Sequence, residues 1–526
     1  PPVNIKPDKP VKVTQADREA AAARAEADGF TIEAVGAADM AMAGDAPRYF
    51  SHPNYANSPL PGNIVAEWNA FAQDLLQPAP DPNMPMAMPT ISMSKAFVIL
   101  SYMQAAVYDA LVAIEGGYTP YNAAILASAD PTASREAAIS TAAFKTLEFA
   151  LQGELDYATA FQPKLEAAYA DALASIPASA AKAAGIVVGQ AAANGIIALR
   201  SGDVLSGTGG YTVQPAGPGV WQPTAPMPPM DPWMANLKPF LRAAPDQYNA
   251  SIGASPVLTD TEYMNNDPAY IADFEEVKAY GGAMSMLRTP DMTETAEFWT
   301  TNMVIQANAS YRNVAETRGL NLLDTARLMA VGNMAAVDSL VATFDTKYFY
   351  SFWRPHTAIQ HTNPDGSYSA TVVEPWKPLL MVPNFPEYVA GHGSFVSAQA
   401  EVYTWFFGTD LFTVDLNSLV TNTTRQFTSA AQMREEIINA RTWGGLHFRT
   451  SSVLAVTLGQ TLVSDALVTY FQPAADLSTH EVVSGGIRKF VDELSMLCDP
   501  SVSPCTGNGT ATLDQSLPIG VPDTTT

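Results

Sequence analysis

Apolar residues recur along most of the chain every three or four positions, the spacing that places them on one side of an α-helix. Over residues 94–114 they occupy nearly the whole helical circumference, so this helix is predicted to lie in the middle of a bundle. The same periodicity predicts further helices, over residues 15–27, 134–152, 157–175, 179–200, 268–280, 293–309 and 323–344. The chain is therefore predicted to be all-α, with short strands as a minor component.

Proline and glycine interrupt the helical pattern most strongly over residues 207–245, which also contain tryptophan. Because proline has no amide hydrogen and disfavours helix interiors, this segment is predicted to be an extended strap. A chain of 526 residues exceeds what one hydrophobic core usually supports, which favours two helical-bundle halves. The predicted order is an N-terminal arm (1–50), a first bundle (51–206), the connecting strap (207–267), a second bundle with the functional site (268–475) and a tail (476–526).

Composition limits the classes of partner. Hydrophobic residues make up 47% of the chain and charged residues 15%, which is typical of a folded globular protein. The formal net charge of -24 would be repelled by nucleic acid or an anionic membrane, so neither is expected as a partner. No run of about 18 uninterrupted apolar residues occurs, so no membrane-spanning helix is expected. The composition leaves open whether the protein forms a homo-oligomer.

The two cysteines bear on the compartment. Cys498 and Cys505 lie close together near the end of the chain, and we predict that they form a disulfide. A disulfide favours an oxidising environment, so a secreted or periplasmic protein is expected; the start at Pro1 without methionine is expected of a processed product. Two free thiols are the alternative, and thiol titration of the denatured, unreduced protein distinguishes them.

Three short runs in the second half carry candidate chemistry: KYFYSFWRP (347–355), FPEYVAGH (385–392) and RTWGGLH (441–447). Lys347 and Arg354 are seven residues apart, so a continuous helix would present both cations on one face. Pro355 disfavours helical backbone at Arg354, which predicts that the helix ends there and that the guanidinium faces a loop.

The second and third runs place further donors around helix ends. Apolar periodicity begins just after His392, which predicts that Gly391 and His392 stand at a helix N-terminus, where unpaired N–H groups attract anions. Arg441 and His447 would lie on different faces of an unbroken helix. The glycines at 444 and 445 allow a break that lets both side chains point the same way.

Three cations, a helix N-terminus and two imidazoles are the groups that a site needs to hold a phosphate-like oxyanion and to move a proton. The alternative is that Lys347, Arg354 and Arg441 pair with surface carboxylates and that the histidines are satisfied core residues. His356 and His361 are also close in sequence, but without a third ligand nearby they favour supporting roles over a metal site.

The order Lys-x6-Arg-Pro, Pro-x4-Gly-His and Arg-x5-His resembles the signature of the vanadium-dependent haloperoxidases and the related acid phosphatases. The resemblance implies a two-bundle helical fold and a bound vanadate. Its oxygens would be held by Lys347, Arg354, Arg441 and the backbone N–H of Gly391. The resemblance also makes His447 the residue that ligates vanadium and His392 the acid–base residue.

Two pocket positions affect the implied chemistry. Phe385 matches an aromatic residue of chloroperoxidase-like members, whereas Ala390 replaces a serine that usually precedes the Gly-His pair. Loss of that hydroxyl donor predicts a less polarising site, so we expect oxidation of bromide and iodide in preference to chloride.

The implied activity is oxidation of halide by hydrogen peroxide, followed by halogenation of a small organic acceptor. His392 would move the proton, and Lys347 would polarise the peroxide. One alternative is an acid phosphatase with His447 as nucleophile, because phosphate and vanadate share charge and shape. A non-catalytic oxyanion-binding protein is the other.

Overall fold

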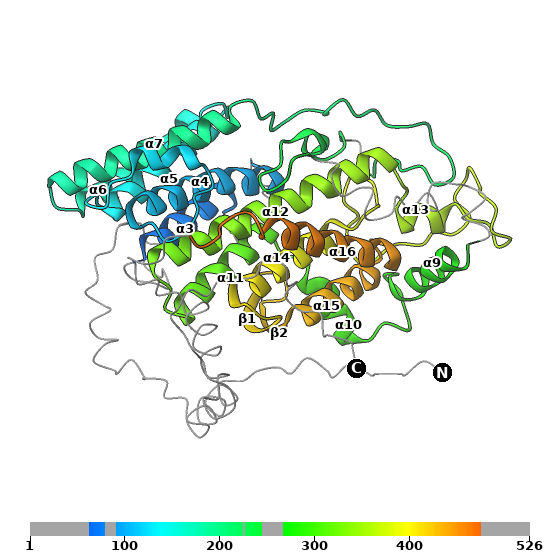
Figure 1. Cartoon of the computed structure of the whole chain (residues 1–526). Helices are drawn as coiled ribbons and strands as arrows, with labels where there is room; N and C mark the ends of the chain where they lie inside the picture. Colours follow the sequence, from blue (N-terminus) through cyan, green and yellow to red (C-terminus); the bar gives the residue numbers. More distant parts are fainter. Residues whose placement is uncertain (1–62, 79–90, 225–226, 245–266, 475–526) are drawn as a thin grey trace, which may run out of the picture. The chain divides into compact units, whose positions relative to one another are not determined.

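A 29-residue helix, α12 (Leu322–Tyr350), runs through the centre of the fold and is buried along nearly its whole length (Figure 1). The structure, a computed structural model, describes residues 63–78, 91–224, 227–244 and 267–474. Helix α12 begins where the Asn321 side chain accepts a hydrogen bond from the Asp324 N–H (2.8 Å), which caps the first turn. The predicted helix over residues 15–27 and the Cys498–Cys505 pair lie outside the described residues.

Helices from the first half of the chain cover one side of α12. The central one is α4 (Met93–Glu115), which contacts α12, α5 and α7 and is almost entirely buried, as its all-round apolar pattern predicts. The other elements of this half are α3 (Ile64–Leu76), η3 (Ala123–Ser128), α5 (Arg135–Leu151), η4 (Tyr157–Phe161), α6 (Gln162–Ala174) and α7 (Ala180–Arg200).

Helices from the second half meet α12 through α14 (Gly391–Phe407), which also packs closely on α16 (Arg449–Ala466). A Cβ atom at Gly459 of α16 would lie 2.1 Å from the Ser394 carbonyl oxygen, so glycine is needed for this close approach. The remaining elements are α9 (Pro268–Tyr280), α10 (Pro290–Phe298), α11 (Met303–Thr317), α13 (Pro355–Gln360), β1 (Leu411–Ser418), β2 (Thr423–Ser429) and α15 (Ala430–Trp443).

The prediction of a mostly helical fold is confirmed, and several details of the helix pattern are wrong. The helix predicted over residues 293–309 is two helices, α10 and α11, because Asn302 caps a new N-terminus. The region predicted as helix 157–175 begins with the π-helical turn η4 and becomes α-helical only from Gln162. Helix α3 was not predicted.

The strands are few and short. β1 and β2 form one antiparallel hairpin whose location was not predicted, and Val414 pairs with Phe427 within it. At the turn signal of residues 363–366, the Asn363 N–H donates to the Ser367 carbonyl oxygen (2.8 Å), and only the isolated bridge Thr362–Tyr368 flanks the turn.

Between α7 and α9, the described residues 201–224 and 227–244 form loops and turns, with the short 3-10 helix η5 (Pro232–Asn236) among them. Their backbone pairs with the segment that follows α12: the Trp221 N–H donates to the Ser351 carbonyl oxygen (2.8 Å), and the Trp353 N–H donates to the Gly219 carbonyl oxygen (2.9 Å). These hydrogen bonds fix residues 351–353, which lead directly into Arg354. The predicted domain boundaries stay predictions.

Three described helices, α4, α7 and α12, are long and apolar enough to cross a membrane by length and composition. Two of them, α4 and α12, are covered by other helices of the fold, whereas α7 is one-third buried over its most apolar window (33%). The apolar composition of α4 and α12 is accounted for by the core.

Candidate functional site

The three cationic side chains predicted to form one site lie near one another, but not along one helix. Helix α12 ends at Tyr350, because Ser351 adopts a left-handed backbone conformation (φ 51°). Arg354 therefore lies beyond the helix that carries Lys347, in extended backbone (φ -81°, ψ 154°) directly before α13. The predicted shared helix face is wrong, and the predicted loop position of Arg354 is confirmed. We call Lys347, Arg354 and Arg441 the cation cluster.

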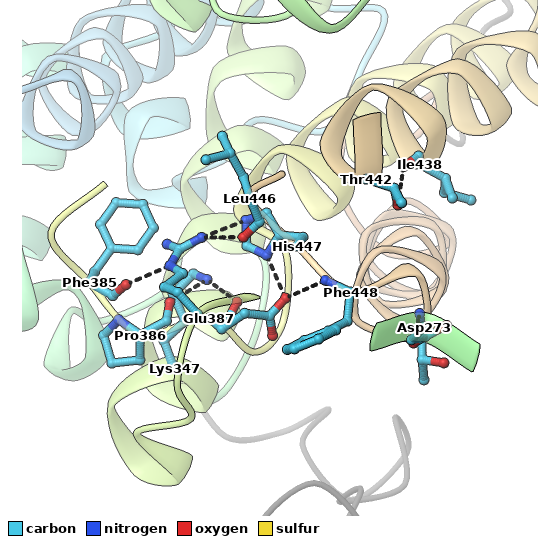
Figure 2. Close-up of polar contacts among 12 residues, drawn as sticks. Asp273, Lys347, Phe385, Pro386, Glu387, Ile438, Thr442, Leu446, His447 and Phe448 are labelled. Carbon is cyan, nitrogen blue, oxygen red and sulfur yellow. Dashed lines mark hydrogen bonds and ion pairs between the residues drawn. The ribbon is translucent and has the colours of Figure 1, made fainter. Parts of the chain in front are cut away.

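Segment 385–387 brings Lys347 and Arg354 together through its main-chain carbonyl groups (Figure 2). The Arg354 Nε donates to the Phe385 carbonyl oxygen (3.0 Å). The Lys347 Nζ donates to the carbonyl oxygens of Pro386 (3.0 Å) and Glu387 (2.7 Å). The half-buried Phe385 ring lies 5.0 Å from Lys347 Nζ and 4.9 Å from Arg354 Cζ, measured to its centroid.

His447 approaches the cation cluster from the turn between α15 and α16. Helix α15 ends at Trp443, and Gly445 takes the positive φ of 75° that the predicted break requires. The Arg354 Nη1 lies 3.1 Å from the His447 Nε2 and also donates to the Leu446 carbonyl oxygen (3.0 Å). On the other side of the ring, His447 Nδ1 lies 2.8 Å from the Glu387 Oε1.

Arg441 is a cation of the site whose guanidinium group lacks hydrogen-bond acceptors among the described residues. It stands in the last turn of α15 and is 2% exposed, yet its Nε and Nη1 have no hydrogen-bond partner among the described residues. The Nη2 of the fully buried Arg354 is likewise unpartnered within that part of the chain. A buried charged donor without an acceptor is costly, so these three nitrogens indicate a ligand with several anionic oxygens.

Helix α14 adds its N-terminus to the site, as predicted. It begins at Gly391, and a Cβ atom there would contact Lys347 Cε (3.9 Å), so the helix start lies beside this lysine. Ala390 occupies the N-cap position and offers no side-chain cap. The nearby Ser394 hydroxyl is hydrogen bonded to Thr343 Oγ1 (2.6 Å) and donates to the Gly391 carbonyl oxygen (3.0 Å), so it does not replace the missing serine donor.

The second imidazole of the site differs from His447 in its surroundings. His392, the second residue of α14, is only partly buried and has no hydrogen-bond partner among the residues that the structure describes. An unengaged ring at the edge of a cation cluster is free to exchange a proton with a bound ligand.

Burial lowers the pKa of every cation of the site, and repulsion by neighbouring cations adds to this effect at Lys347 and Arg441. Burial first, then Arg354 and Arg441, hold the pKa of Lys347 well below its usual range. Burial likewise lowers the pKa of Arg354 to about 10 and, together with the neighbouring Arg354, that of Arg441 to about 9. An anion bound among them would relieve both effects, because it supplies the opposite charge that these groups lack.

The surroundings of both histidines favour the neutral form of the ring. Burial, followed by the nearby cations, holds the pKa values of His392 and His447 well below the usual histidine range. Burial raises the pKa of the neighbouring Glu387 to about 7, against the opposing effect of Lys347 and Arg354. A neutral imidazole can offer a nitrogen lone pair to a ligand, whereas an imidazolium cannot.

The sequence-based reasoning missed Glu387, which accepts from His447 and also from the Phe448 N–H (3.1 Å). The sequence feature that could have pointed to Glu387 is that it is the single carboxylate inside the run FPEYVAGH. His356 and His361 make local hydrogen bonds, to Thr357 Oγ1 (3.3 Å) and the Ser369 carbonyl oxygen (2.9 Å), rather than to the residues of the cation cluster. The described residues contain no group of three or more His, Cys, Asp or Glu side chains able to hold a metal cation.

The donor set therefore fits an oxyanion better than a bare metal ion. It combines three cations, a helix N-terminus, unpartnered guanidinium nitrogens and a single imidazole nitrogen, His447 Nε2, among them. A tetrahedral anion with a central atom that accepts one nitrogen ligand, such as vanadate, matches this set in charge and number of donors.

Comparisons with known proteins bear on the fold of the chain. Residues 327–474 match the family described as the VCPO second helical-bundle domain. The structure of a bacterial vanadium-dependent iodoperoxidase is similar with a TM-score of 0.62 and 20% sequence identity, covering 78% of this chain and 97% of that one. A holo-type bacterial vanadium-dependent chloroperoxidase gives 0.54 and 15% identity, covering 75% and 94%. An apo-type bacterial vanadium-dependent chloroperoxidase gives 0.53 and 15%, covering 71% and 93%. No curated protein sequence matches the chain.

Proposed function

We propose that this chain, whose residues 327–474 belong to the VCPO second helical-bundle domain family, is a vanadate-dependent haloperoxidase. It oxidises halide with hydrogen peroxide to a hypohalous equivalent, and a small organic acceptor is halogenated. The observation that supports this proposal is the set of buried guanidinium nitrogens that have no hydrogen-bond partner among the described residues, Arg354 Nη2 and Arg441 Nε and Nη1, in a site where Arg354 also contacts His447.

The cofactor would be held by the groups described above. Arg354, Arg441 and Lys347 would bind the vanadate oxygens together with the N–H of Gly391, and His447 Nε2 would be the protein ligand to vanadium. When bound, vanadate supplies Lewis-acid activation of hydrogen peroxide toward a halide ion.

Lys347 is restrained in a way that suits an electrostatic role. Two of its three donors go to the carbonyl oxygens of Pro386 and Glu387, which fixes the ammonium and leaves one donor for the ligand. The Phe385 ring beside it keeps water from one side of the ammonium and so strengthens its pull on a bound oxygen. His392, partly exposed and unengaged, would exchange the proton.

The halide preference follows from Ala390. No side chain caps the first turn of α14, and the Ser394 hydroxyl is engaged elsewhere, so the anion has one hydroxyl donor fewer than a serine at 390 would give. A less polarised peroxide is a weaker oxidant, so it reacts with the halides that are easier to oxidise, bromide and iodide, in preference to chloride. We therefore propose bromide and iodide as substrates in preference to chloride.

The net charge of -24 supports a protein that binds neither nucleic acid nor an anionic membrane, and export to the periplasm or the medium remains part of the proposal. The proposal of export rests on the predicted Cys498–Cys505 disulfide.

Halogenation of a phenolic dye tests the proposal. Wild type, His392→Ala and His447→Ala are assayed with peroxide and each halide, with and without orthovanadate, and phosphomonoester hydrolysis is followed in parallel. His361→Ala serves as a control, because this histidine is hydrogen bonded to the Ser369 carbonyl oxygen, away from the site.

We expect vanadate-dependent bromide and iodide oxidation in wild type and in the control, at least a hundredfold less in His392→Ala, and none in His447→Ala. Phosphomonoester hydrolysis without halide oxidation, lost in His392→Ala, would establish the phosphatase alternative instead. Absence of both activities despite vanadate binding would leave an oxyanion-binding protein.

A further inference from the structure

We propose that Glu387 is a positioning residue that fixes the tautomer and the ring orientation of His447, so that the Nε2 lone pair faces the cation cluster. The ligand that uses this lone pair is the one in the proposed function. The tautomer itself is a property of the protein without ligand, and the hydrogen bonds on the two sides of the ring determine it.

The two sides of the His447 ring assign its proton. Arg354 Nη1 lies 3.1 Å from Nε2, and a guanidinium can only donate, so Nε2 must carry the lone pair. The proton of the neutral ring is then on Nδ1, which donates to the Glu387 Oε1 at 2.8 Å. The opposite tautomer would set an N–H against the Arg354 donors and leave no lone pair toward the cluster.

Glu387 is itself held in place. The Phe448 N–H donates to the same oxygen, Oε1, at 3.1 Å, so two donors converge on it. The Glu387 main-chain oxygen accepts from Lys347 Nζ at 2.7 Å. The side chain is fully buried, which excludes competing water. One residue therefore links His447, from the turn before α16, to Lys347, from the end of α12.

The position of Glu387 at the centre of this network predicts which replacements are tolerated. In Glu387→Gln the carbonyl oxygen of the amide should face the two converging donors, so the tautomer is kept while the negative charge is lost. In Glu387→Ala no acceptor remains for Nδ1–H. Removing a carboxylate that orients a ligating histidine typically lowers metal affinity about 10–100-fold.

The first measurement is ¹⁵N NMR of histidine-labelled protein without vanadate, with the His447 resonances identified by their loss in His447→Ala. We expect one tautomer, protonated at Nδ1, in wild type and in Glu387→Gln, and a mixture or the opposite tautomer in Glu387→Ala. A pure Nδ1–H tautomer in Glu387→Ala would overturn the proposal.

The second measurement is calorimetric titration with orthovanadate. We expect affinity to fall about 10–100-fold in Glu387→Ala and less in Glu387→Gln. The matched control is Glu276→Gln, since Glu276 accepts from Arg449 Nε (2.7 Å) and Nη2 (2.6 Å) at the start of α16 without touching His447. Its affinity should equal that of wild type.

The outcomes separate the two proposals. If wild type binds no vanadate, the proposed function fails while the NMR comparison still decides the role of Glu387. If Glu387→Ala does not fold, Glu387→Gln decides the role of Glu387: loss of the Nδ1–H tautomer, although an acceptor oxygen is still present, would contradict the proposal.

Discussion

Replacing Arg441 by methionine should stabilise the vanadate-free protein while weakening its hold on vanadate. Arg441 is a buried cation whose Nε and Nη1 lack acceptors among the described residues, and its nearest charged influence is another cation, Arg354. Methionine has a similar length, no charge and no donors to leave unsatisfied. The substitution therefore removes a cost of the folded state without stranding any partner.

The size of the effect follows from the pKa. Burial and Arg354 lower the pKa of Arg441 to about 9, and at 1.36 kcal/mol per pH unit the charged form is disfavoured by at most ~5 kcal/mol. Replacing buried ionic groups by apolar residues of similar volume gains about 1–4 kcal/mol in practice. We expect Arg441→Met to raise the free energy of unfolding by ~1–3 kcal/mol, which for a chain of this length is about 1–3 °C in the melting temperature.

Thermal unfolding in buffer without phosphate, sulfate or vanadate measures this difference. Arg425→Met is the matched control, because Arg425 Nη1 lies 3.0 Å from the Glu436 Oε2 and its loss leaves this half-buried carboxylate without its cation. The control should lose ~1–3 kcal/mol. Orthovanadate at a hundredfold excess over its Kd should stabilise wild type by about 2.7 kcal/mol, and Arg441→Met by much less. If Arg441→Met melts below wild type in oxyanion-free buffer, the unpaired charge is not a cost and the reasoning is wrong.

Three further outcomes are expected. Gly445→Ala should lower the free energy of unfolding by more than ~2 kcal/mol and weaken vanadate binding, since φ is 75° and the new Cβ would lie 2.4 Å from the Gly281 carbonyl oxygen. Thermal unfolding and calorimetry measure the two effects, and Gly153→Ala, whose new Cβ would meet nothing within 4 Å, is the control for both. Burial lowers the pKa of His356 from 6.5 to about 4, so as the pH falls this histidine is protonated in the unfolded chain before it is protonated in the folded protein. The free energy of unfolding should therefore fall by ~2 kcal/mol between pH 6.5 and 4. Urea unfolding should show a flatter pH profile for His356→Gln, and a profile equal to that of wild type would contradict this. Ala390→Ser should tighten vanadate binding about tenfold by calorimetry, because it restores a hydroxyl donor at the N-cap; unchanged affinity would mean that the hydroxyl only caps the helix.

Much of the helical framework was predictable because its causes act over a few residues. The all-round apolar pattern of residues 94–114 predicts a central helix, and α4 is that helix. Periodicity after His392 predicts the start of α14, and the glycine pair predicts the break between α15 and α16. Where the local signal was a single cap, as at Asn302 or Ser351, the helix boundary was missed.

The residue types of the site could be predicted, because the three runs carry the cations, the histidines and the helix N-terminus in a recognisable order. How these groups meet depends on the tertiary structure. Arg354 reaches His447 across 93 positions and Glu387 reaches His447 across 60, and no periodicity specifies such pairs. Their contact depends on how α12, α14 and α16 pack, and that packing is set by the whole core rather than by any local run of residues.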